Sequence, residues 1–186
     1  MPRRSYDHYC PLSRALDVIG ERWTLLIVRE LLAGPRRYTD LHADLPGVST
    51  DVLAARLKEL ESDGLVTRRR LPPPAAASVY ELTPRGSGLL SALTALAEWG
   101  AAELPPAPGP TDALRAHWFA LPLLNRVAAA AGVRTGVVNV RLDEGSFHVV
   151  LGRDGEGLAY GDGLAEGADA QITLSLAECL ALARGE

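Results

Sequence analysis

The sequence predicts an α+β protein in two parts: a mostly helical N-terminal domain with one β-hairpin, and a small antiparallel sheet domain with helices. The chain has 186 residues, enough for two small domains. Residues 104–110 read LPPAPGP, and such a proline-rich segment neither continues a helix nor lies inside a sheet. Apolar residues recur with helical spacing before this segment, and four alternating runs follow it. We therefore expect domains at 1–104 and 111–186, joined by a stiff linker at 105–110.

Composition and charge restrict the classes of function. Apolar residues make up 47% and charged residues 23% of the chain, which is typical of a globular protein and not of a disordered one. Residues 1–103 contain 13 Lys and Arg and 13 Asp and Glu, whereas residues 104–186 contain 6 and 10, so the net charge of −4 lies in the second half. This balance excludes a uniformly basic coat but allows a local basic face.

The sequence lacks the signals of several protein classes, namely disulfide-rich, membrane-spanning, secreted and catalytic proteins. Two cysteines cannot form a disulfide framework, no apolar run reaches the length of a membrane span, and the first residues lack a secretory signal. These features predict a cytoplasmic protein with reduced thiols and no membrane partner. No metal-ligand spacing or nucleophile motif is found, so we expect no enzyme, no metal and no cofactor. The four histidines are scattered: His8, His42, His117 and His148.

The N-terminal half reads as four helices, a hairpin and a further long helix. Apolar spacing predicts helices at 12–19, 23–32, 40–45 and from 50 to about 63. Thr39 and Ser49 are the expected N-caps of the third and fourth helices, and Pro46-Gly47 forms the turn between them. Strands are expected at 65–71 and 78–82. Thr83-Pro84 then starts a helix over 84–102 with an apolar face.

Two short helices joined by a tight turn and followed by a hairpin are the parts of a winged helix-turn-helix. The second helix fits the major groove of DNA, and arginines on the hairpin can reach phosphates. For each residue alone, a solvated strand face or an ordinary core helix is the alternative reading. The predicted DNA-binding residues are Arg36, Arg37, Thr39, Ser49, Thr50, Asp51, Ala54, Ala55, Arg56, Lys58, Arg68, Arg69 and Arg70.

The C-terminal half predicts a helix, four antiparallel strands and a second helix. Thr111 is the expected cap of a helix that runs to about residue 131 and is kinked or broken at Pro122. Alternating runs predict strands at 137–142, 147–151, 157–160 and 170–174, and Ser175 caps a helix at 176–184. Its helices are expected on one face of the sheet, where an apolar pocket could lie between the layers.

From Cys10 to Gly100 the chain resembles the HxlR-type family of bacterial winged-helix transcriptional regulators. The matching segments are CP at 10–11, LDVIGERWTLLIVREL at 16–31, GPRRYTDL at 34–41, LPGVS at 45–49, Leu53, RLKELE at 56–61, DGLV at 63–66, YELTPRG at 80–86 and AEWG at 97–100. The resemblance implies a homodimeric regulator, expected to be a repressor, on a pseudo-palindromic double-stranded DNA operator. It also implies that the N-terminal segment and the helix at 84–102 build the dimer interface.

Two departures from the family pattern concern DNA reading. The second helix of the pair carries Ala54 and Ala55 where members often have polar residues, and alanine can only contact a thymine methyl group. The return strand of the hairpin lacks the usual arginine before Tyr80. Base reading is therefore expected to depend more on Ser49, Thr50 and Asp51, and binding more on backbone contacts and DNA shape.

Cys10 lies at the position that some members of this family use as a redox sensor. A lowered thiol pKa would be required, and Arg14 or His8 could supply positive charge. The alternative is a small buried residue before a helix. A thiol-based regulator that acts through Cys10 is thus one rival hypothesis, whereas Cys179 lies in the other domain.

The C-terminal half resembles the sterol carrier protein type-two fold, in segments at 138–151, 162–163, 168–173 and 180–186. The resemblance implies a sensor domain that binds a hydrophobic small-molecule effector and thereby modulates DNA binding. Ordinary core packing is the alternative for each residue. A second rival function is a lipid-binding protein whose winged helix serves only for dimerisation. The candidate ligand-binding residues are Trp118, Phe119, Leu123, Leu124, Phe147, Val149, Ile172, Leu174 and Leu180.

Overall fold

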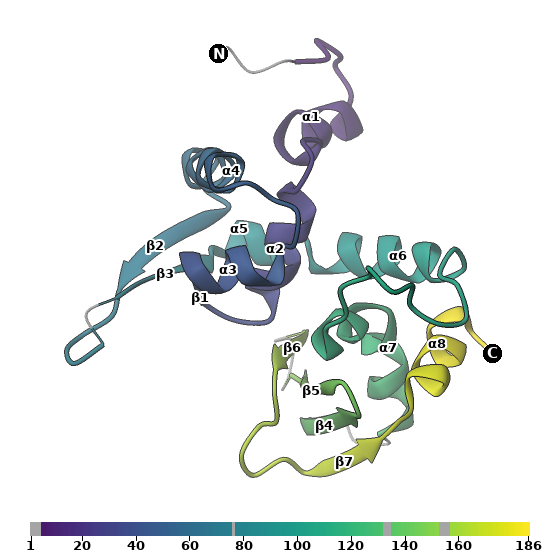
Figure 1. The fold of residues 1–186 in the computed structure, drawn as a ribbon. Helices are drawn as coiled ribbons and strands as arrows, with labels where there is room; N and C mark the ends of the chain where they lie inside the picture. The colour runs from purple at the N-terminus through teal and green to yellow at the C-terminus, as the bar shows by residue number, and fades with distance from the viewer. Residues whose placement is uncertain (1–4, 76, 132–134, 153–156) are drawn as a thin grey trace. The chain divides into compact units, whose positions relative to one another are not determined.

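The computed structural model describes residues 5–75, 77–131, 135–152 and 157–186, and it divides into two compact units (Figure 1). The N-terminal unit extends to Gly88 without residues 32–34, and the C-terminal unit contains those three residues and the chain from Leu89 onward. Each unit has its own sheet, and helices accompany both sheets. The predicted mixed α+β class is therefore confirmed.

The N-terminal unit combines helices with a three-stranded antiparallel sheet. The strands β1 (Arg36–Arg37), β2 (Val66–Arg70) and β3 (Ser78–Leu82) lie in the order β1-β3-β2, so the hairpin has a third, short strand at its edge. The helices are α1 (Pro11–Ile19), α2 (Thr24–Leu32), α3 (Tyr38–Asp44), α4 (Thr50–Ser62) and α5 (Pro84–Ser87).

The core of this unit comes from the inner faces of α2, α3 and α4. Ile27 and Val28 of α2 are fully buried, as are Leu41 of α3 and Leu53 of α4. Glu30 is also fully buried, and its carboxylate accepts a hydrogen bond from Arg29 at 2.8 Å. By contrast, none of the nine residues of α1, all of which are described, is buried in the single chain. Burial of apolar side chains thus stabilises the packing of α2, α3 and α4 and leaves α1 outside this core.

Two details of the N-terminal unit differ from the prediction. Thr39 is not the N-cap of the third helix, because α3 already begins at Tyr38 and the Asp40 carboxylate accepts the Arg37 N–H at 3.2 Å. The helix expected over 84–102 is divided into α5, capped by Thr83 as predicted, and α6 (Leu90–Ala101). Gly86 of α5 packs so closely on the Leu65 carbonyl that a Cβ would overlap it. The single turn of α5 is therefore packed against the start of the hairpin.

The C-terminal unit contains a four-stranded sheet in the order β6-β5-β4-β7. The short 3₁₀ helix η1 and helix α7 contact β5 and β6, and α7 also packs on α6 and α8. Phe147 and Val149 of β5 and Val140 of β4 are fully buried beneath these helices. The elements are α6, η1 (Ala116–Phe119), α7 (Ala120–Ala130), β4 (Gly136–Leu142), β5 (Gly145–Leu151), β6 (Leu158–Asp162), β7 (Ala170–Thr173) and α8 (Leu176–Arg184).

The prediction of four antiparallel strands is wrong in one pairing, because β7 pairs with β4 in parallel. After β6 the chain crosses the sheet between residues 163 and 169 before it enters β7 at the opposite edge. Asn139 of β4 holds this crossover: its side-chain oxygen accepts the Ala165 N–H at 2.9 Å, and its amide donates to the Ala165 carbonyl at 3.1 Å. The crossover returns the chain in the direction of β4, which a hairpin could not do.

The predicted helix start at Thr111 is also wrong, because residues 111–115 lie outside any helix and η1 begins only at Ala116. Pro122 falls in the first turn of α7, where a missing N–H costs no helical hydrogen bond. Ser175 caps α8 as predicted, and its hydroxyl accepts the Glu178 N–H at 3.2 Å.

Helix α6 belongs to the C-terminal unit, whereas the sequence placed it in a domain at 1–104. Asn125 of α7 donates to Glu98 of α6 at 3.3 Å, and the Arg184 guanidinium of α8 donates to the carbonyls of Ala101 and Leu104. An arginine at the C-terminal end of a helix interacts favourably with the free carbonyls there. A truncation at residue 104 would therefore remove the partners of α6.

No helix within the described ranges has both the length and the apolar character needed to cross a membrane.

Candidate nucleic-acid interface

The helix pair α3–α4 is held by local polar contacts at its turn. The Tyr38 hydroxyl at the start of α3 donates to the Thr50 carbonyl at the start of α4, at 2.8 Å. Ser49 caps α4 as predicted, with its hydroxyl accepting the Val52 N–H at 3.3 Å. Gly47 adopts a φ of 91°, a conformation that favours glycine, and so allows the tight turn. These contacts set the position of the first turn of α4 relative to α3.

Helix α4 has one buried and one exposed face. Leu53, Leu57 and Leu60 are buried, with spacings of four and three residues that place them on one side. The opposite side is free of packing within the N-terminal unit. The exposed residues of α4 include the predicted Thr50, Asp51, Ala54, Ala55 and Lys58. The predicted reading helix therefore presents these five residues to solvent.

Arg56 does not share that exposed surface. Its guanidinium lies 2.6 Å from the Glu59 carboxylate and 3.7 Å from that of Glu21, and the side chain is only 20% exposed. Neither carboxylate was predicted as a partner of Arg56. Glu59 could have been found, because residues three apart on a helix are neighbours, whereas Glu21 required the tertiary structure.

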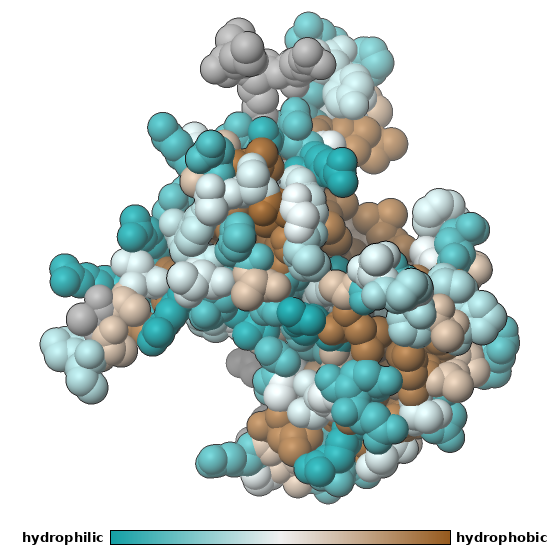
Figure 2. Space-filling view, viewed as in Figure 1, coloured by the Kyte–Doolittle hydropathy of each residue, from teal (hydrophilic) through white to brown (hydrophobic). Residues whose placement is uncertain are grey.

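The hairpin and β1 arrange five arginines on two faces of one sheet. Arg37, Val79 and Arg69 lie in one row across the three strands, and Arg36, Tyr80 and Arg68 lie in the next. Because side chains alternate between faces, Arg37 and Arg69 project to the same side. Arg68, Arg69 and Arg70 are exposed, whereas Arg36 is half-buried. Figure 2 shows hydrophilic residues beside this hairpin.

Two of these arginines have partners within the sheet. The Nε of Arg69 donates to both carboxylate oxygens of Glu81, at 3.1 Å and 3.0 Å. The Arg68 guanidinium lies over the Tyr80 ring, 5.9 Å from its centroid. Glu81 was missed because the pair joins diagonal positions on neighbouring strands, which only the register reveals.

Comparison with known proteins assigns this half of the chain. The family model described as HxlR-like helix-turn-helix matches residues 18–108. The uncharacterized HTH-type transcriptional regulator YvaP of Bacillus subtilis is 40% identical over 91 residues, which are 48% of this chain and 84% of YvaP. The chain belongs to the HxlR-like helix-turn-helix family.

Other HTH-type transcriptional regulators are similar to the same half of the chain. The regulator sll1512 of Synechocystis is 37% identical over 93 residues, covering 50% of this chain and 69% of its own. YodB of Bacillus subtilis is 35% identical over 91 residues, covering 48% and 81%. The solved structure of reduced YodB has a TM-score of 0.46 at 32% identity and covers 54% of this chain and 100% of its own.

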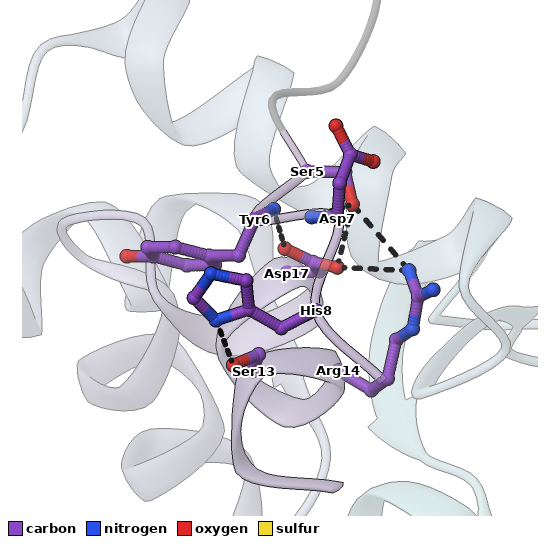
Figure 3. A network of polar contacts seen from close by, with 7 residues as sticks. All are labelled: Ser5, Tyr6, Asp7, His8, Ser13, Arg14 and Asp17. Atoms are coloured by element: carbon purple, nitrogen blue, oxygen red, sulfur yellow. Dashed lines mark hydrogen bonds and ion pairs between the residues drawn. The ribbon is translucent and has the colours of Figure 1, made fainter. Parts of the chain in front are cut away.

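The N-terminal segment of this HxlR-like chain folds back on α1 (Figure 3). The Asp17 carboxylate accepts the Tyr6 N–H at 2.9 Å and the Ser5 hydroxyl at 3.0 Å, and Arg14 lies 3.4 Å away. The hydrogen bond from the Tyr6 N–H stabilises the charged carboxylate and is the main cause of the lowered pKa of Asp17. His8 Nδ1 and the Ser13 hydroxyl are 3.2 Å apart. These contacts hold residues 5–8 along α1, from Ser13 in its first turn to Asp17 near its end.

The two cysteines occupy different environments. Cys10 is half-buried at the N-terminus of α1, and hydrogen bonds from the backbone N–H groups of Ser13 and Leu12 lower its thiol pKa. Cys179 of α8 is fully buried, and burial raises its pKa to about 12. Cys10 is therefore the thiol with the lowered pKa and the greater exposure, and it is not the buried residue of the alternative interpretation.

The candidate ligand-binding residues belong to η1, α7, β5, β7, α8 and the position just after β7, all in the C-terminal unit. Phe119, Leu123, Leu124, Phe147, Val149 and Leu180 are buried, and Trp118, Ile172 and Leu174 are half-buried. The HxlR-like match ends at residue 108, so the resemblance of the following part to the sterol carrier fold stays a prediction. Within the described ranges, no group of three or more His, Cys, Asp or Glu could hold a metal ion.

Proposed function

We propose that this chain is a homodimeric, sequence-specific DNA-binding transcriptional regulator of the repressor type. The observation that carries the proposal is the free face of α4, opposite the buried leucines of the same helix. A helix of this kind fits the major groove, where base edges differ between sequences. HTH-type regulators among its HxlR-like relatives support the same function.

Positive charge on the hairpin supports the proposed contact with the DNA backbone. Residues 1–103 have equal numbers of basic and acidic residues, so binding cannot depend on the overall charge of this half. Arg68, Arg69 and Arg70 are consecutive and exposed on β2. Each phosphate that they neutralise releases counterions, and the affinity should therefore fall steeply with salt concentration.

Exposed apolar residues support the proposed dimer. Leu12 and Leu16 of α1, one helical turn apart, are 67% and 39% exposed, and Figure 2 shows an apolar surface at α1. On α6, Leu96 and Trp99 are 51% and 75% exposed. Apolar surfaces of this kind are typical of protein contacts. A second copy of the chain would cover them and present two α4 helices to a pseudo-palindromic operator.

The test uses the purified full chain. Selection from a random pool of double-stranded DNA should enrich a sequence with two-fold symmetry, and electrophoretic shifts should weaken as salt is raised. Analytical ultracentrifugation should report a dimer without DNA. A chain that enriches no sequence, or that binds DNA only as a monomer, would contradict the proposal. A dimer that enriches no sequence would favour the rival interpretation, a lipid-binding protein whose winged helix serves dimerisation.

Replacing Glu81 by glutamine should strengthen DNA binding. The change removes a negative charge next to the hairpin and releases Arg69 from its partner. One additional phosphate contact would make the salt dependence steeper by about 0.9 in log–log slope and raise the affinity roughly 3- to 10-fold. Glu103→Gln removes the same charge from the C-terminal unit and should leave both values unchanged. A weaker complex for Glu81→Gln would mean that Glu81 positions Arg69 for DNA.

A thiol-based response is a second candidate, favoured by the lowered pKa of Cys10. At neutral pH, iodoacetamide should alkylate Cys10 in the folded protein and Cys179 only after denaturation, because burial keeps Cys179 protonated. If DNA binding responds to a mild oxidant through Cys10, Cys10→Ser should abolish the response and Cys179→Ala should retain it. An unchanged response in Cys10→Ser would remove this candidate.

We also propose that the C-terminal unit modulates DNA binding through a hydrophobic effector bound between its helices and sheet. Trp118, Ile172 and Leu174 are half-buried, so a molecule that enters from solvent can reach them more easily than the six buried candidates. Native mass spectrometry of the purified protein would report a co-purified small molecule and the number of subunits together. Effector binding that leaves operator affinity unchanged would exclude this regulation.

A further inference from the structure

The exposed face of α4 has a composition that restricts which bases it can read. Asp51, Ala54, Ala55 and Lys58 are exposed, and their spacings of three, four and seven residues align them in one stripe along the helix. The stripe thus has a carboxylate at its N-terminal end, two methyl groups in the middle and an amine at the other end. At a rise of about 1.5 Å per residue it spans about 10 Å, or about three base pairs.

Arg56, the arginine of α4, is held by ion pairs away from the exposed stripe. An arginine can donate two hydrogen bonds to the edge of guanine, but Arg56 lies against the carboxylates of Glu59 and Glu21. Tyr38 also holds the first turn of α4 through the Thr50 carbonyl, which limits rotation of the helix about its axis. The stripe that begins at Asp51 is therefore an exposed surface that can make base contacts without Arg56.

Each residue of the stripe matches one chemical group of the major groove. A carboxylate accepts a hydrogen bond from the N4 amino group of cytosine and repels phosphates and the acceptor-rich edge of guanine. An alanine methyl group makes an apolar contact with the C5 methyl group of thymine. A lysine can contact phosphates as a point charge or donate to the O6 and N7 acceptors of guanine.

We propose that α4 reads a step of about three base pairs in which a cytosine faces Asp51 and thymine methyl groups face Ala54 and Ala55. The inference rests on the proposed function and specifies the DNA that this site selects. Asp51 contributes specificity mainly by excluding other bases, since it carries the same sign of charge as the DNA. Ala54 and Ala55 contribute by shape, because their small side chains allow the helix to approach the thymine methyl groups closely.

The experiment removes single methyl groups from the DNA. After selection of a binding sequence with the full chain, each thymine is replaced in turn by deoxyuridine, which lacks only the C5 methyl group. At two positions per half-site the affinity should fall roughly 3- to 5-fold, as expected for the loss of one buried methyl contact. Ala54→Gly and Ala55→Gly should each abolish this loss at one of the two positions, while Ala129→Gly, an exposed alanine in the C-terminal unit, should abolish neither.

Asp51→Asn provides an independent readout. It should remove the preference for cytosine at the neighbouring position and raise the affinity for unrelated DNA, because a repulsive charge is lost. If a symmetric sequence is selected but deoxyuridine has no effect, or if the losses persist in both glycine variants, the base assignment is overturned and the proposed function stands. If no sequence is selected at all, both are overturned.

Discussion

The double variant Arg68→Ala/Arg70→Ala should bind operator DNA roughly 10- to 100-fold more weakly than the unchanged protein and with a salt slope smaller by about 1.8. Both side chains are exposed on β2, and within the described part of the hairpin neither forms an ion pair with a carboxylate. The loss should be similar for selected and unrelated DNA, because phosphate contacts carry no sequence information. Titrations at several salt concentrations measure both quantities.

The matched control for this prediction is Arg69→Ala. Arg69 already donates to Glu81, so its removal should cost less affinity than the removal of Arg68 or Arg70. Thermal unfolding should be nearly unchanged in all of these variants, since exposed ion pairs contribute little stability. An unaltered salt slope in the double variant would show that the hairpin does not contact phosphates, and the proposed docking of the winged unit would have to be abandoned.

Leu57→Ala should mainly lower stability and Lys58→Ala should mainly lower DNA affinity, although the two residues are adjacent on α4. Leu57 is 1% exposed and packs on the core, so its truncation should lower the free energy of unfolding of the N-terminal unit by about 3 kcal/mol. Lys58 is exposed on the opposite face, and its truncation should change that free energy by less than about 0.5 kcal/mol. DNA affinity at low temperature should fall for Lys58→Ala, whereas folded Leu57→Ala should retain most of it.

Chemical denaturation followed by circular dichroism, together with titration of the operator, separates the two effects. The C-terminal unit has its own core, so a second transition that is common to both variants serves as the internal reference. A strongly destabilised Lys58→Ala, or a Leu57→Ala variant of normal stability, would contradict the assignment of the two faces of α4.

Local signals in the sequence predicted much of the fold. Ser49, Thr83 and Ser175 were expected as N-caps, and each side chain accepts a backbone N–H in the first turn of its helix. The return strand at 78–82 has the predicted bounds. These features depend on residues within three or four positions of one another, so a single stretch of sequence contains the information. The exposed stripe of α4 follows in the same way from the spacing of its leucines.

Other features depend on residues that are distant in sequence, and local patterns could not reveal them. The parallel pairing of β7 with β4 requires the crossover held by Asn139, because an alternating strand pattern does not encode direction. The break before α6 depends on Gly86 packing against Leu65, and the placement of α6 depends on α7 and α8. Thr39 failed as a cap because Asp40 already supplied the acceptor for the Arg37 N–H.

The same division applies to the candidate interface. Residue order alone identified the helix pair, the hairpin and the set of exposed side chains, because helical and strand periods assign each residue to a face. Only the folded chain showed which of those charges are available, since Arg56 meets Glu21 and Arg69 meets Glu81 across separate elements. Electrostatic partners are chosen by distance in space, and that distance is set by packing and strand register rather than by separation along the chain.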